Sequence, residues 1–262
     1  MTVTLAVAGK GGVGKTTIAA LVIKFLSQHR QGNILAIDAD PSSNLHITLG
    51  MDLEWTVGEI REEMLEQVKS SLLGGGAAMG TLPGGQTKRD YLEYHVHSAL
   101  VEGSRFDLIA MGRPEGPGCY CAVNHNLRQV IDDLSRHYQW VVIDNEAGME
   151  HLSRRTTRDV QHLFVVSDPT PRGLVAAQRI VALSRELDIR VEKVWLVLNR
   201  APAGDLSPLL QQEIEKTGAP LLGCIPHDEH LLALEVGGHP LIALAEDAPS
   251  YRALAAMLER IL

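Results

Sequence analysis

A glycine-rich loop near the start of the chain carries the clearest chemistry. It reads Gly9-Lys10-Gly11-Gly12-Val13-Gly14-Lys15-Thr16, followed by Thr17, and fits the pattern G-x-x-x-x-G-K-[ST] without a mismatch. Glycines let the backbone turn tightly and point its N–H groups at phosphate oxygens. A helix that starts near Lys15 adds its positive end. We expect Lys15 to reach the β- and γ-phosphates of ATP and the Thr16 hydroxyl to ligate Mg²⁺. Gly9–Thr17 is called the phosphate loop below.

Two apolar segments that resemble buried strands end in carboxylates. Ile34–Ile37 is followed by Asp38 and Asp40, and Trp140–Ile143 is followed by Asp144. Ligands bind at the carboxyl ends of the strands in open α/β sheets. Asp38 and Asp40 lie on one side while the strand stays extended, so either could hold a Mg²⁺ water or orient the attacking water. Asp144 fits a Walker B-like pattern and is expected to bind Mg²⁺ through a water, with a helix N-cap as the ordinary alternative.

Two cysteines separated by one residue follow a loop rich in Gly and Pro. Cys119 and Cys121 stand just before a helical pattern that begins near Asn124, and a helix N-terminus favours thiolates. Soft metal ions prefer four ligands, whereas this pair supplies two. A symmetric dimer would complete the set, so we expect a metal site there rather than an incidental surface pair. Cys224, inside an apolar strand, is expected to be a buried core thiol.

Three histidines are weaker candidates for metal ligands. His95 and His97 would place two imidazoles on one face of an extended segment, and His125 follows Cys121 by four residues. Exposed polar side chains without a metal are the ordinary explanation for all three.

Seven apolar segments alternate with helical patterns along the chain. The expected strands are Val3–Ala8, Ile34–Ile37, Asp107–Ala110, Trp140–Ile143, Leu163–Val166, Val194–Leu198 and Leu221–Ile225. The expected helices include Thr16–Gln28, Asn124–Arg136, Leu174–Leu187, Ser207–Thr217 and a packing helix over Tyr251–Leu262. This alternation predicts a P-loop α/β domain whose mostly parallel sheet has helices on both faces. A length of 262 residues suits a single domain over 1–262, with an insertion loop at the Gly-rich stretch 70–85.

Charge and composition argue against several classes of protein. The net charge is −8 and no dense run of Lys or Arg is present, so we expect no binding of nucleic acid. Arg154, Arg155 and Arg158 are expected to be a solvated face. The first eight residues lack the basic region of a signal peptide, and no apolar run reaches the length of a membrane span. We therefore expect a cytoplasmic protein without stable membrane anchoring, whose thiols stay reduced.

The loop sequence GKGGVGKTT resembles the deviant Walker A motif of one group of P-loop ATPases. That group includes septum-placing and chromosome-partitioning ATPases, the nitrogenase iron protein and metallocentre assembly ATPases. The resemblance implies that Lys10 crosses a dimer interface to the partner's nucleotide. It also implies that Asp40 positions the attacking water, which leaves Asp38 a structural role. Asn199 would bond the adenine through its amide donor and acceptor, with Pro226 in the segment that flanks the base.

A longer resemblance adds the cysteine segment. The run MGRPEGPGCYC, with GKGGVGKTT before it and DNEAGMEHL after it, looks like the CooC-type nickel-insertion accessory ATPases of carbon monoxide dehydrogenase. The likeness covers nearly the whole chain. It implies a nucleotide-dependent homodimer that binds Ni²⁺ or Zn²⁺ at Cys119 and Cys121 and has carbon monoxide dehydrogenase or acetyl-CoA synthase as its client. Asn145 departs from the family pattern, which often has Met there.

Two other functions stay open. An electron-transfer ATPase similar to the nitrogenase iron protein would hold an iron–sulfur cluster with one cysteine from each of two separated segments, and the segment after Asp144 contains none. A positioning ATPase on membrane or DNA would need a basic surface. The membrane-binding relatives end in a basic amphipathic helix, whereas Tyr251–Leu262 carries only Arg252 and Arg260, offset by Glu259.

Overall fold

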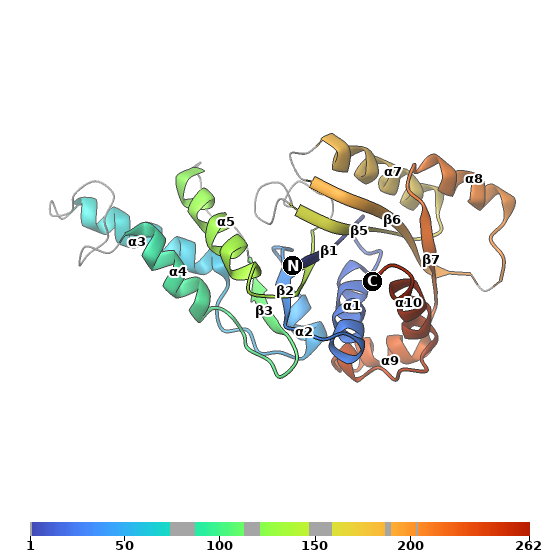
Figure 1. Ribbon diagram of the computed structural model, residues 1–262, viewed down its shortest axis with the longest axis horizontal. Coiled ribbons are helices and arrows are strands. Elements are labelled where there is room, and N and C mark those ends of the chain that lie inside the picture. The colour runs from blue at the N-terminus through green and yellow to red at the C-terminus, as the bar shows by residue number, and fades with distance from the viewer. Residues whose placement is uncertain (1, 74–86, 113–120, 147–158, 187–189, 203) are drawn as a thin grey trace.

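A seven-stranded parallel sheet forms the centre of the protein (Figure 1). The structure, a computed structural model, describes residues 2–73, 87–112, 121–146, 159–186, 190–202 and 204–262. The strands are β1 Val3–Gly9, β2 Ile34–Asp38, β3 Asp107–Ala110, β4 Trp140–Asp144, β5 Asp159–Ser167, β6 Arg190–Ala201 and β7 Leu221–Pro226. Their order across the sheet is β3-β2-β4-β1-β5-β6-β7. This arrangement confirms the predicted fold class and all seven predicted strands.

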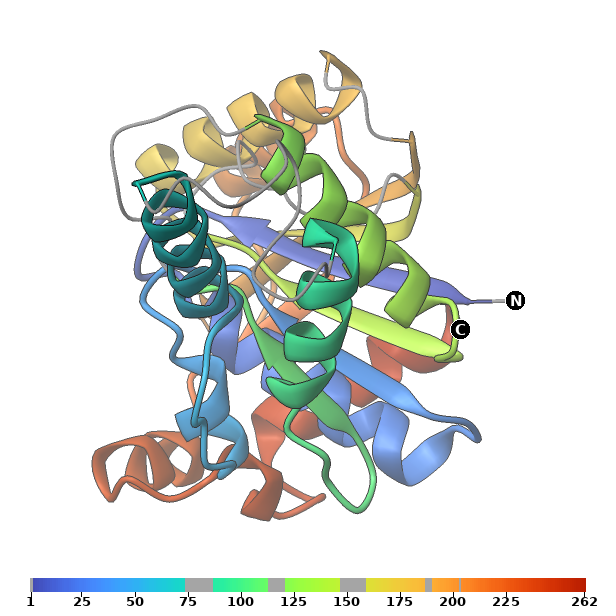
Figure 2. The same ribbon diagram turned by 90° about the vertical axis from the view of Figure 1, so that its left-hand side faces the viewer.

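Helices cover both faces of the sheet (Figures 1 and 2). The α-helices are α1 Lys15–His29, α2 Leu45–Leu49, α3 Val57–Leu73, α4 Lys88–Ser98, α5 Cys121–Ser135, α7 Pro171–Glu186, α8 Pro208–Lys216, α9 Glu229–Val236 and α10 Pro249–Glu259. A 3₁₀ turn, η1, spans Leu241–Ala243. The apolar core on one face includes side chains from α1, α2, η1 and α10, and that on the other includes side chains from α3, α4, α5, α7 and α8.

The central strand β1 shows why the strand segments are apolar throughout. Leu5 and Val7 pack into the core that contains α1 and α10, and Ala6 and Ala8 pack into the core on the other face. All four side chains are fully buried. A strand with both faces covered excludes water from every position, so the sequence shows a continuous apolar run.

One expectation from the sequence was wrong in this part of the chain. The segment with His95 and His97 is helical, because it lies within α4, where Thr87 caps the first turn. Residues two apart lie on nearly opposite sides of a helix, so these imidazoles do not share a face. The expected insertion loop at 70–85 overlaps the end of α3, which continues to Leu73, and 74–85 lies outside the described residues.

The helix α10 confirms the predicted packing helix at the end of the sequence. Tyr251, Leu254 and Leu258 are buried, in the core that also contains side chains of α1 and β7. The apolar face of α10 is therefore occupied within the fold. In the part of the chain that the structure describes, none of the helices combines the length and apolar character that a bilayer span needs.

Asp228 joins the starts of two helices. Its Oδ1 accepts hydrogen bonds from the N–H groups of His230 and Leu231, at the first turn of α9. Its Oδ2 accepts from both the N–H and the hydroxyl of Ser250, at 2.9 and 2.6 Å, in the first turn of α10. Burial opposes the ionisation of Asp228, but the bonds from Ser250, Leu231 and His230 outweigh it and lower its pKa.

Asp228→Asn is expected to lower the free energy of unfolding by about 1–2 kcal/mol at neutral pH, because the amide nitrogen cannot accept hydrogen bonds. The contribution of a carboxylate with a lowered pKa is complete above its unfolded-state pKa, about 4, and is lost as the pH falls through the folded-state value. Urea unfolding should therefore show a gap between the variant and the parent at pH 7 that shrinks below about pH 4. The exposed Asp247 provides a matched control in Asp247→Asn. Equal stability of Asp228→Asn and the parent at pH 7 would contradict this role.

Candidate nucleotide-binding site

The phosphate loop joins β1 to α1 through left-handed backbone. Gly12 has a φ of 79° and Gly14 a φ of 90°, values that strain any residue with a Cβ. A Cβ on Gly14 would also lie 2.4 Å from Nδ2 of Asn199, and one on Gly9 would lie 2.5 Å from the backbone oxygen of Val166. These positions need glycine, and with it the loop keeps the tight curvature that the motif requires.

The two lysines of the phosphate loop lie in different surroundings. Lys15, the first residue of α1, is only 8% exposed, and its charge acts on Asp144. Lys10 is exposed. The first N–H groups of a helix have no partner within that helix, so α1 presents donors beside a buried ammonium group. This combination favours an anion held inside the loop, whereas Lys10 is accessible to a second molecule.

The hydroxyl of Thr16 donates a 2.6 Å hydrogen bond to Oδ2 of Asp144. The two residues are brought together because β1 and β4 are parallel neighbours, with Val7 opposite Asp144. Burial raises the pKa of Asp144 to about 7. The bond from Thr16 and the charge of Lys15 act against this rise, and the charges of Asp38 and Asp40 add to it. The site therefore disfavours a bare negative charge on Asp144 and favours a nearby cation.

A Mg²⁺ ion fits this pair of side chains. Oδ1 of Asp144 is buried and has no hydrogen-bond partner among the described residues, and an unpaired buried acceptor is costly. Mg²⁺ in nucleotide sites is commonly held by one or two protein oxygens together with phosphate oxygens and water. Among the described residues, no three His, Cys, Asp or Glu side chains form a cluster suited to a metal ion. The donors present thus suit an ion that arrives with phosphate ligands.

Asn145, where the resemblance leads us to expect Met, fastens β4 to the central strand. Its backbone N–H and its side-chain Nδ2 both donate to the carbonyl of Val7, at 3.1 and 2.9 Å. The side chain is 1% exposed. This contact holds the end of β4 beside β1, and so it supports the position of Asp144.

The extended strand that was expected to carry both Asp38 and Asp40 ends at Asp38. Oδ1 of Asp38 accepts the N–H of Asp40 at 3.1 Å, and Oδ2 accepts the N–H of Leu45 at 2.9 Å. Burial raises the pKa of Asp38 to about 6, even though both bonds oppose it. Asp38 therefore shapes the turn after β2. Asp40 is half-buried, and its Oδ1 accepts the N–H of Ser42 at 2.8 Å.

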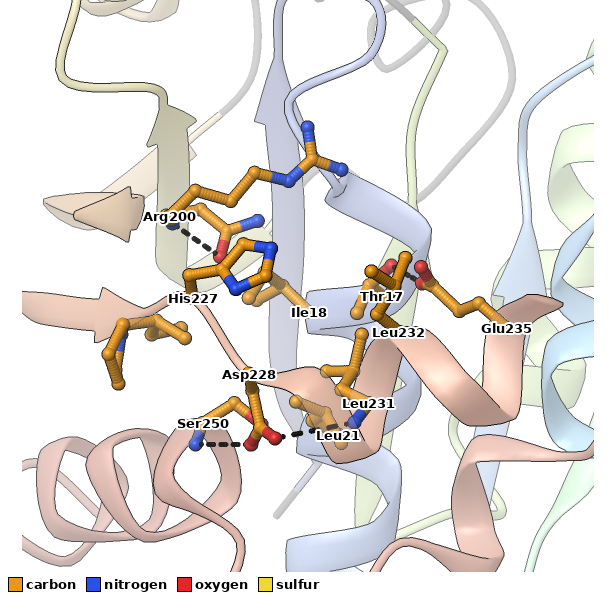
Figure 3. A pocket seen from close by; sticks show the side chains of 13 residues that line it. Thr17, Ile18, Leu21, Arg200, His227, Asp228, Leu231, Leu232, Glu235 and Ser250 are labelled. Atoms are coloured by element: carbon orange, nitrogen blue, oxygen red, sulfur yellow. Dashed lines mark hydrogen bonds between the residues drawn. The ribbon is translucent and has the colours of Figure 1, made fainter. Parts of the chain in front are cut away.

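A pocket of about 300 Å³ lies beside the phosphate loop (Figure 3). Its apolar walls are Ile18 and Leu21 of α1, Ile225 of β7, and Leu231 and Leu232 of α9. The rest of the lining is Thr17, Asn199, Arg200, Pro226, His227, Asp228, Glu235 and Ser250. An apolar hollow with a few polar groups suits a flat heterocycle with polar edges.

Asn199 and Pro226, the two residues predicted for the base site, both line this pocket. Nδ2 of Asn199 donates to the carbonyl of Val13 at 2.8 Å, and its Oδ1 accepts the N–H of Arg200 at 3.0 Å. A carboxamide has two donors and two acceptor lone pairs, so one of each is left for a ligand. The pocket and the phosphate loop therefore share Asn199, as a site for a nucleoside triphosphate requires.

Helix α9 provides a wall that the sequence reasoning missed. Glu235 accepts a 2.8 Å hydrogen bond from the hydroxyl of Thr17, which ties α9 to the phosphate loop across the pocket (Figure 3). None of the α9 side chains is buried, so this polar contact and the Asp228 cap are important to its position. The signal that could have found α9 is Asp228 followed by Glu229, an N-cap followed by an acidic first turn.

The cysteines and histidines proposed as metal ligands are only partly described. Cys119 lies outside the described residues, and Cys121 is the first residue of α5, three residues before the predicted helix start. His125 stands one turn later in α5. The ring of His95 packs on Tyr91, with centroids 4.1 Å apart. Cys224 packs against the core but is only partly buried, and burial raises the pKa of its thiol.

Solved structures with this fold include cell division ATPases. The matched chain of the MinC:MinD complex of Aquifex aeolicus has a TM-score of 0.70 at 20% identity, and covers 99% of this chain and 95% of its own. MinD of Pyrococcus horikoshii, complexed with Mg-ADP, has a TM-score of 0.67 at 19% identity, with 100% and 96% covered. At these identities the likeness shows the fold alone.

Relatives in sequence extend over nearly the whole chain. An uncharacterized ATP-binding protein of Methanocaldococcus jannaschii is 42% identical over 258 residues, 98% of each chain. The carbon monoxide dehydrogenase accessory protein CooC of Rhodospirillum rubrum is 30% identical over 264 residues, 98% of this chain and 97% of its own. The family model of the CobQ/CobB/MinD/ParA nucleotide binding domain matches residues 4–241. The chain therefore belongs to the CobQ/CobB/MinD/ParA family and is a P-loop ATPase.

Proposed function

We propose that this ATPase is a metallochaperone that assists nickel insertion into carbon monoxide dehydrogenase, or into acetyl-CoA synthase. The observation that carries the proposal is the Cys119-x-Cys121 pair in a chain that is 30% identical to CooC over 98% of its length. Cys121 begins α5, and the positive end of a helix favours the thiolate form that binds soft metal ions. Nickel is the cargo of this reaction, and ATP hydrolysis drives its handling.

The phosphate loop holds ATP in this proposal. Backbone N–H groups and Lys15 bind the phosphates, and Thr16 and Asp144 hold Mg²⁺, Asp144 through a water. The ion, when bound, neutralises charge on the β- and γ-phosphates. Asp40 accepts a hydrogen bond from the attacking water and orients it toward the γ-phosphorus. Asn199 and Pro226 bind the adenine in the adjoining pocket. The unpaired, buried Oδ1 of Asp144 and its raised pKa support this assignment.

In this proposal a homodimer completes the nucleotide site and the cysteine metal site. The exposure of Lys10 suits a residue that reaches the nucleotide of a second subunit. Two Cys-x-Cys units, one from each subunit, supply the four thiolates that a soft ion prefers. One ATP-dependent interface would complete the nucleotide site and the cysteine site together. Hydrolysis of ATP would therefore change the distance between the two cysteine pairs, which offers a way to bind and release the ion.

A second candidate function is that of a positioning ATPase, as in the MinD proteins with the same fold. The packing of the α10 apolar face into the core disfavours the use of that helix as a membrane anchor. Co-sedimentation with anionic liposomes and with DNA distinguishes the two functions. ATP-dependent pelleting at physiological salt would support the positioning role.

Lys15→Ala should abolish ATP binding or turnover, because it removes the charge that faces the phosphates. Asp40→Asn should keep ATP binding but lose most turnover, because the attacking water is no longer oriented. Phosphate release and equilibrium binding of a fluorescent ATP analogue measure the two effects. Lys216→Ala, on the exposed end of α8, is the control. Wild-type turnover by Asp40→Asn would show that the assignment of Asp40 is wrong.

Lys10→Ala should impair ATP-dependent dimerisation and turnover more than it impairs nucleotide affinity of the monomer. The reason is that its ammonium group acts on the partner's nucleotide rather than on its own. Size-exclusion chromatography with a non-hydrolysable ATP analogue gives the dimer fraction, and analogue binding at low protein concentration gives the monomer affinity. An unchanged dimer fraction with full activity would leave Lys10 as an ordinary surface lysine.

The cysteine pair should bind about one Ni²⁺ or Zn²⁺ per dimer. Thiolate binding requires proton loss, so the metal affinity should weaken as the pH falls. The double change Cys119→Ser and Cys121→Ser should remove stoichiometric metal and metal-induced dimerisation, and should leave ATP binding intact. Cys224→Ser, the remaining cysteine, is the matched control and should keep the metal. Tight nickel binding by the double variant, or one ion per monomer, would contradict the shared site.

A further inference from the structure

Two consecutive residues at the end of β6 support the phosphate loop from outside. Nδ2 of Asn199 donates to the carbonyl of Val13 at 2.8 Å, and Nη1 of Arg200 donates to the carbonyl of Gly12 at 3.2 Å. The two carbonyls are consecutive, as are the two donors. Figure 3 shows the Arg200 side chain extended along the upper side of the base pocket, away from Asp228 and Ser250.

The backbone of β6 is distorted at the same place. Arg200 has a φ of 54°, one of two positive values among the described residues other than glycine. The pairing of β6 with β7 shifts register between Leu198 and Ala201, and Oδ1 of Asn199 accepts the N–H of Arg200 at 3.0 Å. Neighbouring side chains of a regular strand point to opposite faces, whereas this bulge lets both contact one loop.

The left-handed backbone of Arg200 is unfavourable, because a residue with a Cβ is sterically crowded there. Such strain persists only where the surrounding structure enforces it, and it is often found at functional sites. The Asn199 contact and the register shift enforce it here. In this strained conformation the guanidinium group of Arg200 contacts the carbonyl of Gly12.

The planar peptide explains what this contact does. In a trans peptide the C=O and the following N–H point in opposite directions. When Arg200 holds the carbonyl of Gly12, the N–H of Val13 points away from Arg200. When Asn199 holds the carbonyl of Val13, the N–H of Gly14 points away from Asn199 in the same manner. N–H groups that converge inside the loop are the donors that phosphates need.

We propose that Arg200 is a positioning residue that orients the phosphate loop for ATP by holding the carbonyl of Gly12. This inference rests on the proposed role of the phosphate loop and goes beyond it, because Arg200 acts on the loop and not on the nucleotide. The resulting N–H bonds to phosphate are made in the ground state and in the transition state alike. Loss of Arg200 therefore weakens substrate binding more than it slows the chemical step.

The test is Arg200→Asn. Asparagine tolerates left-handed backbone, but it is too short to reach Gly12. We expect the KM for ATP and the Kd for ADP to rise about tenfold, with kcat and the melting temperature little changed. Inhibition by tripolyphosphate, which has no base, should weaken by a similar factor, whereas inhibition by adenosine should not. Arg200→Lys, which keeps a charged donor, should restore most of the affinity. Arg190→Asn, at the exposed start of the same strand, is the matched control.

Three outcomes would overturn the inference. An unchanged KM for ATP in Arg200→Asn would show that the contact with Gly12 does not matter. Weaker inhibition by adenosine with unchanged inhibition by tripolyphosphate would assign Arg200 to the base. A fall in melting temperature that Arg200→Lys fails to reverse would indicate a merely structural role. Lys15→Ala separates the two proposals. If Lys15→Ala keeps both ATP binding and turnover, the phosphate-loop assignment itself fails. If Lys15→Ala loses either of them while Arg200→Asn keeps the parental KM for ATP, only the role of Arg200 fails.

Discussion

The parallel pairing of β1 with β4 is the constraint on which the rest of the site depends. It sets Val7 opposite Asp144, and so brings the loop after one strand beside the carboxylate that ends the other. The 2.6 Å bond between Thr16 and Asp144 is its direct result. Parallel strands need long crossovers, and β2 and β3 lie between β1 and β4 in the chain. Thr16 and Asp144, 128 positions apart, therefore meet at one edge of the sheet.

The same edge of the sheet brings together buried carboxylates, which the described residues neutralise only in part. Asp38 and Asp144 are buried at the ends of adjacent strands. The charge of Asp38 adds to the effect of burial in raising the pKa of Asp144, and Lys15 is a buried counter-charge nearby. Both carboxylate oxygens of Asp38 accept hydrogen bonds from backbone N–H groups, so its acceptors are satisfied within the fold. Oδ1 of Asp144, in contrast, has no hydrogen-bond partner within the described part of the chain. The edge thus separates a carboxylate that stabilises a turn from one that is left for a ligand.

The sequence alone was sufficient to predict the features that depend on a local pattern or on buried strands. The phosphate loop, the seven strands and the place of Asp144 all follow from apolar runs and from glycines with short-range roles. The predictions that failed concern elements whose position depends on residues far away in the sequence. Helix α4 is polar on much of its surface and is fixed by packing against α3 and α5, so His95 and His97 were misjudged as extended. Helix α9 buries no side chain, and the contact of Glu235 with Thr17 spans 218 positions of the chain, which no local pattern encodes.

The carboxylate of Asp228 caps the start of α9, which forms a wall of the pocket beside the phosphate loop, and it also accepts hydrogen bonds from Ser250 at the start of α10. One wall of the pocket is therefore fastened to the final helix of the sequence. A chain shortened to end before Pro249 would lose Ser250 along with the packing face of α10, and Asp228 would keep only its bonds within α9. Ser250 follows Asp228 by 22 positions, so during synthesis this wall of the pocket reaches its final form only after Ser250 and α10 have emerged from the ribosome.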